Sequence, residues 1–321
     1  MKALWFDGKR LSLREMKIPE PRKDEALIRI HYAGICNTDL EIFKGYMNFT
    51  GIPGHEFVGT VVKGKTNWLG KRVVGEINLS CGKCAYCGKG LNRHCPDRTV
   101  LGIFKKNGAF AEYLTLPLDN LHPVPDSLSD LEAVFVEPLA AALRILEQVP
   151  LKKDQRVFLL GDGKLAQLIA RAVWLKNKNL LVIGKHPEKL ALLSRVGIKT
   201  ILASHLKPLS PDRKADIVIE ATGNPAGLET AFNLCRATGR IVLKSTFHQK
   251  PKVDLSRLVV DELNLLGSRC GDFTKALKHL AREKIDPREL ISGIYELEDF
   301  AKAFKQANSN KALKVILKCQ T

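Results

Sequence analysis

The sequence predicts an α/β protein in which a β-rich first domain precedes a doubly wound parallel sheet. Before about residue 135, short runs with β-branched, strand-like composition, such as 26–30 and 57–62, are separated by Pro and Gly. After residue 138, strand and helix patterns alternate along the chain. That alternation is typical of a parallel sheet with helices packed on its faces.

The elements of the second part follow a regular order. A helix rich in Ala and Leu comes first, then a buried strand with a glycine turn, and then alternating strands and helices. The expected helices are 139–148, 165–176, 187–196 and 225–236, and the expected strands are 156–160, 180–183, 198–202, 216–220 and 240–244. A tail with helix 274–282 and strand 312–318 is expected to return to the first domain, so the expected divisions are 1–138, 139–271 and 272–321.

Length and composition restrict the class of protein. A chain of 321 residues, 45% hydrophobic and 26% charged, has room for two domains with their own cores. No apolar run approaches the roughly 20 residues needed to span a bilayer, and no secretion signal is recognisable at the start. Eight cysteines in such a chain indicate a reducing cytoplasm, and we expect no membrane partner.

The net charge of +17 admits three interpretations: a nucleic-acid surface, an anionic small molecule, or a solvated lysine surface. The basic residues are scattered, and no basic run is interleaved with the aromatic side chains that stack on single-stranded bases. The charge therefore favours a lysine-rich surface, with a contribution from anionic ligands. We expect no nucleic-acid partner.

Four cysteines lie close together in the pattern C-x2-C-x2-C-x7-C: Cys81, Cys84, Cys87 and Cys95. The Gly and Lys residues between them favour a loop wrapped around an ion. Because Zn2+ is the commonest ion held by four close thiolates, we expect a closed structural zinc site. Two disulfides in a secreted chain and an iron–sulfur cluster are the alternatives.

A glycine turn follows the strand 156–160 and opens the next helix. Its sequence, Gly161-Asp162-Gly163-Lys164-Leu165-Ala166, fits the Gly-x-Gly-x-x-Gly/Ala fingerprint of dinucleotide sites. Gly161 permits the tight turn, Gly163 lets the backbone approach a pyrophosphate, and Ala166 lets the helix pack on the sheet. The helix N-terminus favours an anion. A glycine turn without a ligand is the alternative.

The end of the next strand distinguishes NAD from NADP. NAD sites usually place an Asp or Glu there, about twenty residues after the turn, to bond the ribose 2′-hydroxyl. This chain has Gly184-Lys185-His186 instead, and the first carboxylate is Glu188. Lys185 and His186, with Lys189, are expected to meet a 2′-phosphate, which favours NADP over NAD. A Lys185 that only caps a solvated turn is the alternative.

A second metal site is indicated by Cys36, His55, Glu56 and Glu137. A Cys, a His and a carboxylate suit a catalytic zinc with one open position. Each residue also has an ordinary interpretation. Cys36 would be a buried hydrophobic residue, His55 a turn residue, and Glu137 a residue that favours a helix start.

Together these features resemble the zinc-dependent medium-chain dehydrogenases, the alcohol and polyol dehydrogenase superfamily, over essentially the whole chain. The motifs that carry the resemblance stand in family order: Gly-Ile-Cys-Asn-Thr-Asp at 34–39, Gly-His-Glu-Phe-Val-Gly at 54–59, the four-Cys lobe, Asn-Gly-Ala-Phe-Ala-Glu-Tyr at 107–113, Glu-Pro-Leu at 137–139, the glycine turn, and Glu-Ala-Thr-Gly-Asn-Pro at 220–225. The resemblance implies a GroES-like β domain interrupted by a Rossmann domain and completed by the tail. The Glu-Pro-Leu motif is similar to the sorbitol, threonine and glucose dehydrogenase branches.

The resemblance also implies roles for individual residues. Cys36 and His55 are the implied ligands of a catalytic zinc, with Glu56 or Glu137 as the carboxylate, and Asp39 is implied to orient His55. With the four-Cys lobe, the implied content is two zinc ions per chain, one catalytic and one structural. The implied cofactor-binding residues lie in the glycine turn, at the next strand end and in the 220–225 motif: Gly161, Gly163, Lys164, Leu165, Ala166, Gly184, Lys185, His186 and Thr222.

The implied reaction is hydride transfer. Zinc lowers the proton affinity of a substrate hydroxyl, Thr38 accepts a hydrogen bond from that group and passes its proton outward, and hydride goes to the nicotinamide in an interdomain cleft. Glu41 stands where many relatives have a His that carries the proton to solvent. Three roles are open to Glu41: it bonds a substrate hydroxyl, relays the proton, or faces solvent.

The sequence thus predicts a cytoplasmic, zinc-dependent NAD(P)-linked oxidoreductase that prefers NADP and acts on a secondary alcohol of a polyol or sugar-like molecule. The enzyme alternatives are a threonine-type amino-alcohol dehydrogenase and a simple alcohol dehydrogenase. A non-catalytic zinc- or redox-sensing protein that binds the cofactor is the alternative of another class. The resemblance implies a homodimer or homotetramer that assembles through the Rossmann domain.

Overall fold

The computed structural model describes residues 1–246, 251–282 and 284–320, and the chain divides into two compact units. Unit 1 comprises Met1–Glu137 together with the chain from Phe273 onward, and unit 2 comprises Pro138–Asp272. The expected divisions, after residues 138 and 271, each lie one residue from these limits. Among the described residues, no helix is long and apolar enough to cross a membrane.

Unit 1 is built around a seven-stranded sheet of order β10-β5-β4-β3-β18-β17, in which β9 also pairs with β3. The long strand β3 (Glu25–Ile35) runs antiparallel to β4 (Glu56–Lys63), β9 (Tyr113–Pro117) and β18 (Lys314–Lys318). The other strands of this sheet are β5 (Arg72–Gly75), β10 (Leu121–Pro123) and β17 (Ile291–Glu296). Two smaller sheets join β1 (Lys2–Phe6) to β2 (Leu11–Glu15), and β6 (Asn78–Leu79) to β7 (Thr99–Leu101) and β8 (Lys105–Lys106).

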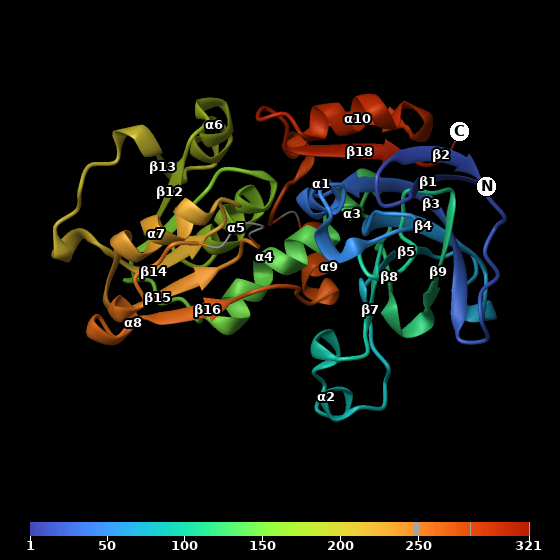
Figure 1. Cartoon of the computed structure of the whole chain (residues 1–321), viewed down its shortest axis with the longest axis horizontal. Helices are drawn as coiled ribbons and strands as arrows, with labels where there is room; N and C mark the ends of the chain where they lie inside the picture. Colours follow the sequence, from blue (N-terminus) through green and yellow to red (C-terminus); the bar gives the residue numbers. More distant parts are fainter. Residues whose placement is uncertain (247–250, 283, 321) are drawn as a thin grey trace. The chain divides into compact units, whose positions relative to one another are not determined.

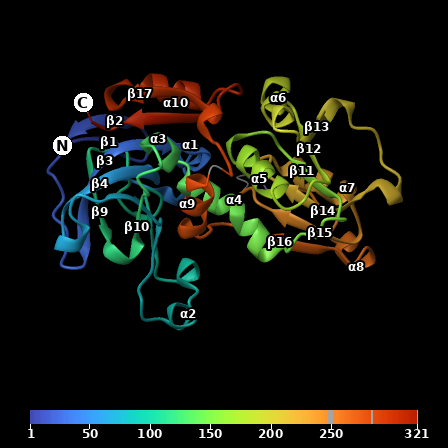
Figure 2. The ribbon, with the colours of Figure 1, turned by 180° about the vertical axis from the view of Figure 1, so that it is seen from behind.

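The tail of the chain completes the sheet of unit 1. Strand β18 inserts beside β3, and the amphipathic helix α10 (Phe300–Ala307) packs on β17 and β18, an arrangement visible in both views (Figures 1 and 2). The remaining α-helices of the unit are α1 (Asn37–Ile42), α2 (Ala85–Gly88), α3 (Asp130–Ala133) and α9 (Phe273–Ala281). Because β18 is needed to pair with β3, this domain is assembled from both ends of the sequence.

Unit 2 is a six-stranded parallel sheet of order β13-β12-β11-β14-β15-β16. The strands are β11 (Val157–Leu160), β12 (Leu180–Gly184), β13 (Lys199–Leu202), β14 (Ala215–Glu220), β15 (Cys235–Leu243) and β16 (Asn264–Gly267). Helix α5 (Lys164–Trp174) packs on β11 and β12, α6 (Pro187–Arg195) on β12 and β13, and α7 (Pro225–Leu234) on β14 and β15 (Figure 1). Helix α4 (Val136–Gln148) leads into the unit, and α8 (Ser256–Val260) precedes β16.

The α/β class and the doubly wound sheet are as the sequence predicts, and every residue of the central β11 is buried, as in a sheet covered on both faces. Among the elements that were not predicted after residue 138 are the short helices α8 and α10 and the edge strand β16. Each is short, and β16 is largely exposed. The expected helix 225–236 ends two residues early, because Cys235 begins β15 with a register irregularity against β14.

A polar network joins three elements of unit 1 around Asp130 at the start of α3. Its Oδ2 lies 2.6 Å from His31 Nδ1 in β3, and its Oδ1 accepts a 2.8 Å bond from Arg72 Nη1 in β5. His31 Nε2 lies 3.0 Å from the Thr60 hydroxyl of β4. The His31 bond, and next the Arg72 bond, lower the pKa of the Asp130 carboxyl. The carboxylate form therefore stabilises this corner of the sheet.

We expect Asp130→Asn to lower the free energy of unfolding at pH 7 by about 1–3 kcal/mol, since hydrogen bonds to charged groups are lost. The folded-state pKa of Asp130 lies below its unfolded value, so its contribution is present above about pH 4 and is lost as the pH falls through the folded-state pKa. Urea unfolding at pH 7 and in acid measures both effects. The exposed Asp126→Asn is the control, and equal stability of the two variants at pH 7 would contradict the assignment.

Candidate metal centres and nucleotide site

Three of the residues expected at the catalytic metal site lie together in unit 1. Cys36 is the N-cap of α1, His55 directly precedes β4, and Glu56 is the first residue of that strand. Their ligand atoms all lie within 4.8 Å of one another. His55 and Glu56 are buried, whereas Cys36 is partly exposed. Cys36 is therefore the member of the cluster that is partly accessible to solvent.

The local backbone fixes this cluster. Gly54 has φ +94°, and a Cβ there would lie 2.6 Å from the Phe110 ring, so the turn that presents His55 requires glycine. Asp39 Oδ2 accepts a 2.8 Å hydrogen bond from the backbone N–H of Cys36 and so closes the first turn of α1. The Asp39 carboxylate, which caps α1, is thereby held beside the imidazole of His55.

Asp39 and His55 form a buried polar pair. The distance from Asp39 Oδ1 to His55 Nδ1 is 3.4 Å, longer than an ordinary hydrogen bond, and neither atom has a hydrogen-bond partner among the described residues. Burial alone would lower the pKa of the His55 imidazole, but Asp39, and next Cys36, raise that pKa well above its ordinary value. The cluster therefore attracts positive charge, and a metal cation at the ligand atoms fits that demand.

Lys314, from β18, is a member of this site that the sequence did not reveal. Its ammonium forms an ion pair and hydrogen bond with Glu56 Oε2, and both side chains are buried. Burial alone would lower the pKa of Lys314, but Glu56, and then Cys36 and Glu137, hold it above its ordinary value. One carboxylate oxygen of the candidate ligand Glu56 is thus already engaged.

The other expected residues surround the cluster at different ranges. Thr38 Oγ1 lies 3.7 Å from Cys36 Sγ. Glu137 is in the first turn of α4 and acts electrostatically on Lys314, but in the described structure it is not part of the group within 4.8 Å. Glu41, on α1, accepts a 2.8 Å bond from Lys44, which lies two residues beyond the end of that helix. Thr38 therefore brings a hydroxyl group close to the Cys36 thiol.

The four expected cysteines gather in a lobe around α2, which projects from the rest of unit 1 (Figure 1). The sulfur–sulfur distances are 3.5 Å for Cys84–Cys87, 3.8 Å for Cys84–Cys95 and 4.0 Å for Cys81–Cys87. A disulfide would need about 2.0 Å. Four sulfurs at tetrahedral corners about 2.3 Å from zinc stand about 3.8 Å apart, so the thiols fit a closed zinc site. Backbone N–H groups of Lys83 and Cys84 lower the pKa of the Cys81 thiol to about 7, which favours a thiolate ligand.

The glycine turn of unit 2 has open space in front of it. Gly161 has φ +115°, and a Cβ there would meet the Ala221 carbonyl oxygen at 2.6 Å. Gly163, the N-cap of α5, has no atom within 4 Å of where its Cβ would stand. Ala166 is buried in the first turn of α5, where Lys164 and Leu165 are partly exposed. This arrangement leaves room for a phosphate group close to the backbone of Gly163.

The carboxylate of Asp162 lies at the end of β12. Its Oδ2 accepts hydrogen bonds from the backbone N–H groups of Lys185 (2.6 Å) and His186 (2.7 Å), and its Oδ1 lies 2.9 Å from His186 Nδ1. A Cβ on Gly184 would lie 2.5 Å from Asp162 Oδ2, which accounts for the glycine. Lys185 is exposed, whereas Lys189 is buried in α6. A carboxylate therefore does reach this strand end, from the neighbouring turn.

Thr222, the remaining expected cofactor residue, lies just after β14. Its hydroxyl donates a 2.5 Å hydrogen bond to Glu220 Oε1, and its backbone N–H donates to the same oxygen at 2.8 Å. Glu220 is fully buried, and its Oε2 has no hydrogen-bond partner among the described residues. The Thr222 hydroxyl is thus committed to this carboxylate.

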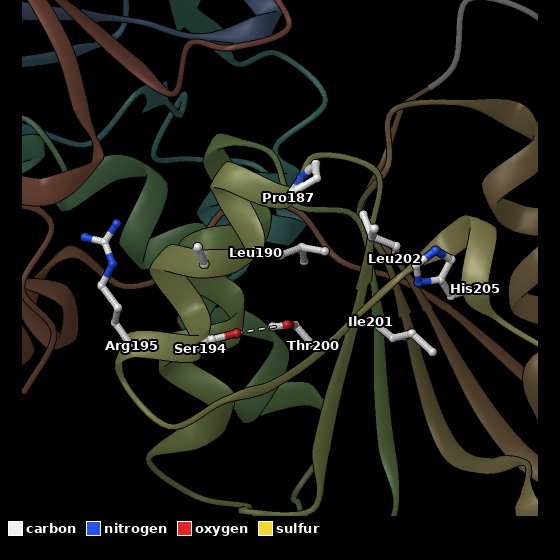
Figure 3. A pocket seen from close by; sticks show the side chains of 9 residues that line it. Pro187, Leu190, Ser194, Arg195, Thr200, Ile201, Leu202 and His205 are labelled. Carbon is white, nitrogen blue, oxygen red and sulfur yellow. Dashed lines mark hydrogen bonds between the residues drawn. The ribbon is translucent and has the colours of Figure 1, made fainter.

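A hollow lies between α6 and the edge strand β13 of unit 2. Leu190 of α6 and Leu202 of β13 face each other across it, and His205 stands beside Leu202 (Figure 3). Ser194 and Thr200 close one end through a 2.9 Å hydrogen bond. Its lining is mainly apolar and brings together no metal-ligating set, so we assign no chemistry to it.

Sequence reasoning missed Lys314, Asp162 and Glu220. For Asp162 the sequence does contain a signal, because this acidic residue stands inside the glycine motif. Lys314 offered none, because its partner Glu56 lies 258 residues away in the chain.

We expect Cys87→Ser to reduce the zinc content by about one ion per chain and to lower the melting temperature, because the lobe has no other core to hold it. Cys36→Ser, at the other cluster, should also remove about one ion but leave the melting temperature closer to that of the wild type. Atomic absorption and calorimetry on the same samples measure both. Unchanged metal content in Cys87→Ser would exclude the four-sulfur site.

Two family models match the chain. Residues 22–126 match the alcohol dehydrogenase GroES-like domain, and residues 163–283 match the zinc-binding dehydrogenase model. Among relatives, the 2-dehydro-3-deoxy-L-galactonate 5-dehydrogenase of Pseudoalteromonas atlantica is 28% identical over 99% of this chain and 98% of its own. The sorbitol dehydrogenase of Halalkalibacterium halodurans is 27% identical over 95% of each.

Solved structures agree over the same range. An alcohol dehydrogenase of Escherichia coli CFT073 with bound NADH has a TM-score of 0.91 and 26% identity, and 99% of each chain is covered. A zinc-binding dehydrogenase of Sinorhizobium meliloti bound to NADP has a TM-score of 0.91 and 25% identity, covering 99% of this chain and 98% of its own. With both domain models matched in order and relatives aligned over nearly the full length, the chain belongs to the zinc-type medium-chain dehydrogenase superfamily.

Proposed function

We propose that this chain is a zinc-dependent dehydrogenase that moves a hydride between a secondary alcohol of a polyol or sugar-like molecule and NAD(P), with NADP preferred. The observation that carries the proposal is the convergence of a thiol, an imidazole and a carboxylate, Cys36, His55 and Glu56, within 4.8 Å. A partly exposed Cys36 beside the buried His55 and Glu56 suits a metal site with an open position for substrate.

Charge balance supports a divalent cation at this cluster. Cys36, Glu56 and Glu137 all act on the single ammonium of Lys314, and Asp39 acts on His55. These groups bring more potential negative charge than one ammonium offsets. In this proposal Cys36 and His55 hold the zinc, with a carboxylate from Glu56 or Glu137.

The reaction removes a hydride from the carbinol carbon and a proton from its hydroxyl, and leaves a ketone and the reduced nicotinamide. Bound Zn2+ would supply Lewis-acid chemistry that lowers the proton affinity of the substrate hydroxyl. Thr38, beside Cys36, accepts the hydrogen bond from that hydroxyl and passes the proton outward. Glu41, paired with Lys44 and partly exposed, stands on the solvent side of α1 and suits the last step to water.

The cofactor preference rests on the end of β12. Gly184 replaces the usual strand-end carboxylate, and Lys185 and His186 are both reachable by solvent there. Solved relatives contain NADH in one case and NADP in another, so they support a nicotinamide cofactor of either kind. The exposed cation of Lys185 favours the 2′-phosphate of NADP.

The names of relatives support the substrate class. An erythritol/L-threitol dehydrogenase of Mycolicibacterium smegmatis is 29% identical over 93% of this chain and 91% of its own, and the sorbitol enzyme above is also a polyol dehydrogenase. An L-threonine 3-dehydrogenase of Coxiella burnetii, 29% identical over 96% of this chain, keeps an amino alcohol as the second candidate. The four-thiol lobe needs reduced sulfur, which supports a cytoplasmic enzyme.

We expect the zinc-loaded enzyme to reduce NADP+ with at least one polyol or sugar alcohol, and Cys36→Ser to lower kcat/KM at least about a thousandfold, because a ligand is lost. Absorbance at 340 nm against polyols, sugars, amino alcohols and simple alcohols measures this. The exposed neighbour Asn37→Ala is the control. Wild-type activity in Cys36→Ser would contradict the proposal.

We also propose that the chain forms a homodimer through the edge of the unit 2 sheet. Strand β16 is the edge strand, and its Leu265 is partly exposed. On the preceding segment, Leu255 is 62% exposed and Val259 and Val260 are each 79% exposed. An unpaired strand edge with an apolar flank is a template for pairing with a second copy.

Replacing both Val259 and Val260 by Lys should convert the dimer to a monomer, since charges would enter the apolar contact. Light scattering after size exclusion measures the mass. Val196→Lys, an equally simple change at an exposed valine beyond α6, should leave the dimer intact. A wild-type monomer, or a dimer that survives the double change, would refute this interface.

A further inference from the structure

The pair formed by Asp162 and His186 carries an inference that rests on the proposed use of NAD(P). Both carboxylate oxygens of Asp162 are engaged at the end of β12, Oδ2 with two backbone N–H groups and Oδ1 with His186 Nδ1. Asp162 is 5% exposed, so this carboxylate is a buried, structural part of the turn. It also occupies the space that a side chain on residue 184 would need.

This contact fixes which ring nitrogen of His186 carries a hydrogen. A carboxylate can only accept, so Nδ1–H is the donor in the 2.9 Å bond to Asp162 Oδ1. Nε2 is the nitrogen that remains for a ligand, and the side chain is 31% exposed. In the neutral ring Nε2 accepts a hydrogen bond, and in the charged ring it donates one. Asp162 satisfies Nδ1 in both forms.

We propose that His186, held in place by Asp162, contacts the 2′ position of the adenosine ribose of the cofactor. Through this contact it makes the preference for NADP over NAD depend on pH. The neutral ring accepts a bond from the 2′-hydroxyl of NAD, which is the task of the missing strand-end carboxylate. The charged ring donates to the 2′-phosphate of NADP and adds a positive charge. Asp162 is the positioning residue and His186 the residue that contacts the ribose.

The other charged groups around this turn do not remove the effect. On α6, Glu188 is exposed and Lys189 is buried, and both interact electrostatically with one another. Burial lowers the pKa of the Lys189 ammonium, while Asp162, and then Glu188, oppose that shift. Lys185 is exposed in the turn itself, and His205 lies beyond β13 in the hollow that begins at Pro187. His186 is the titratable side chain here that bonds Asp162 directly.

The test is calorimetric binding of adenosine 2′,5′-bisphosphate and 5′-AMP to the full-length, zinc-loaded protein between pH 6.5 and 8.5, a readout that needs no turnover. These probes differ only in the 2′-phosphate. The ratio of their affinities should fall at least about fivefold as the pH rises. The 2′-phosphate itself gains charge above about pH 6, which alone would move the ratio the other way. A falling ratio therefore reports the imidazole.

Three variants separate the causes. His186→Asn should make the ratio independent of pH or let it rise. Asp162→Asn should flatten the ratio, because an amide N–H facing Nδ1 opposes the charged ring. Glu188→Gln, which removes a nearby acid on α6 and leaves His186 unchanged, should keep the wild-type fall. If Asp162→Asn does not fold, His186→Asn carries the test alone.

Two results would overturn the inference in different ways. If the affinity ratio of the wild type does not change with pH, or if its fall persists in His186→Asn, the proposed contact of His186 with the ribose is wrong. The proposed use of NAD(P) would still stand. Binding of neither probe to the wild type would remove both this inference and the proposed NAD(P) function.

Discussion

The buried ion pair between Glu56 and Lys314 is the interaction on which the arrangement of unit 1 around the candidate metal ligands depends. It joins β4, near the start of the chain, to β18, the strand that returns at its end, across 258 residues of sequence. Breaking a buried pair by removing one partner typically costs about 3–5 kcal/mol, because a charge is left without compensation. The pair therefore couples completion of the sheet to the charge of the neighbouring Cys36–His55–Glu56 cluster.

Packing around this pair explains the glycine at the start of the Cys36 motif. A Cβ on Gly34 would lie 2.5 Å from Glu56 Oε2 and 2.8 Å from Val134 Cγ1. A larger residue would displace the carboxylate from Lys314 and move the turn that holds Cys36. Gly34 and Gly54 thus serve the same end, since each leaves room for the side chains that place the ligands.

Much of the architecture was predictable, because it rests on local patterns. The alternation of buried strands and helices predicted the parallel sheet, and cysteine spacing predicted the lobe in which the four sulfurs meet. The candidate metal-ligating group was predictable in its residue types, and Cys36, His55 and Glu56 do lie together. Glu137 lies outside that group of described residues, and no local pattern distinguishes it from Glu56.

Contacts that depend on tertiary proximity could not be predicted from the sequence. Lys314 looks like one more residue of a basic chain until β18 pairs with β3 and buries it. At the nucleotide site, the strand end of β12 was correctly seen to lack its own carboxylate, yet Asp162 supplies one from the neighbouring turn. Both cases involve a charged side chain whose partner is set by the fold alone.

The central claim is that this chain holds two zinc ions in different surroundings, one among four sulfurs and one beside a single thiolate. X-ray absorption at the zinc edge of the purified, fully loaded protein tests it most directly. We predict about two zinc ions per chain, with a mixed shell of sulfur at about 2.3 Å and nitrogen or oxygen at about 2.0–2.2 Å. About one zinc ion per chain with a shell of sulfur alone would contradict the catalytic site and with it the proposed hydride transfer.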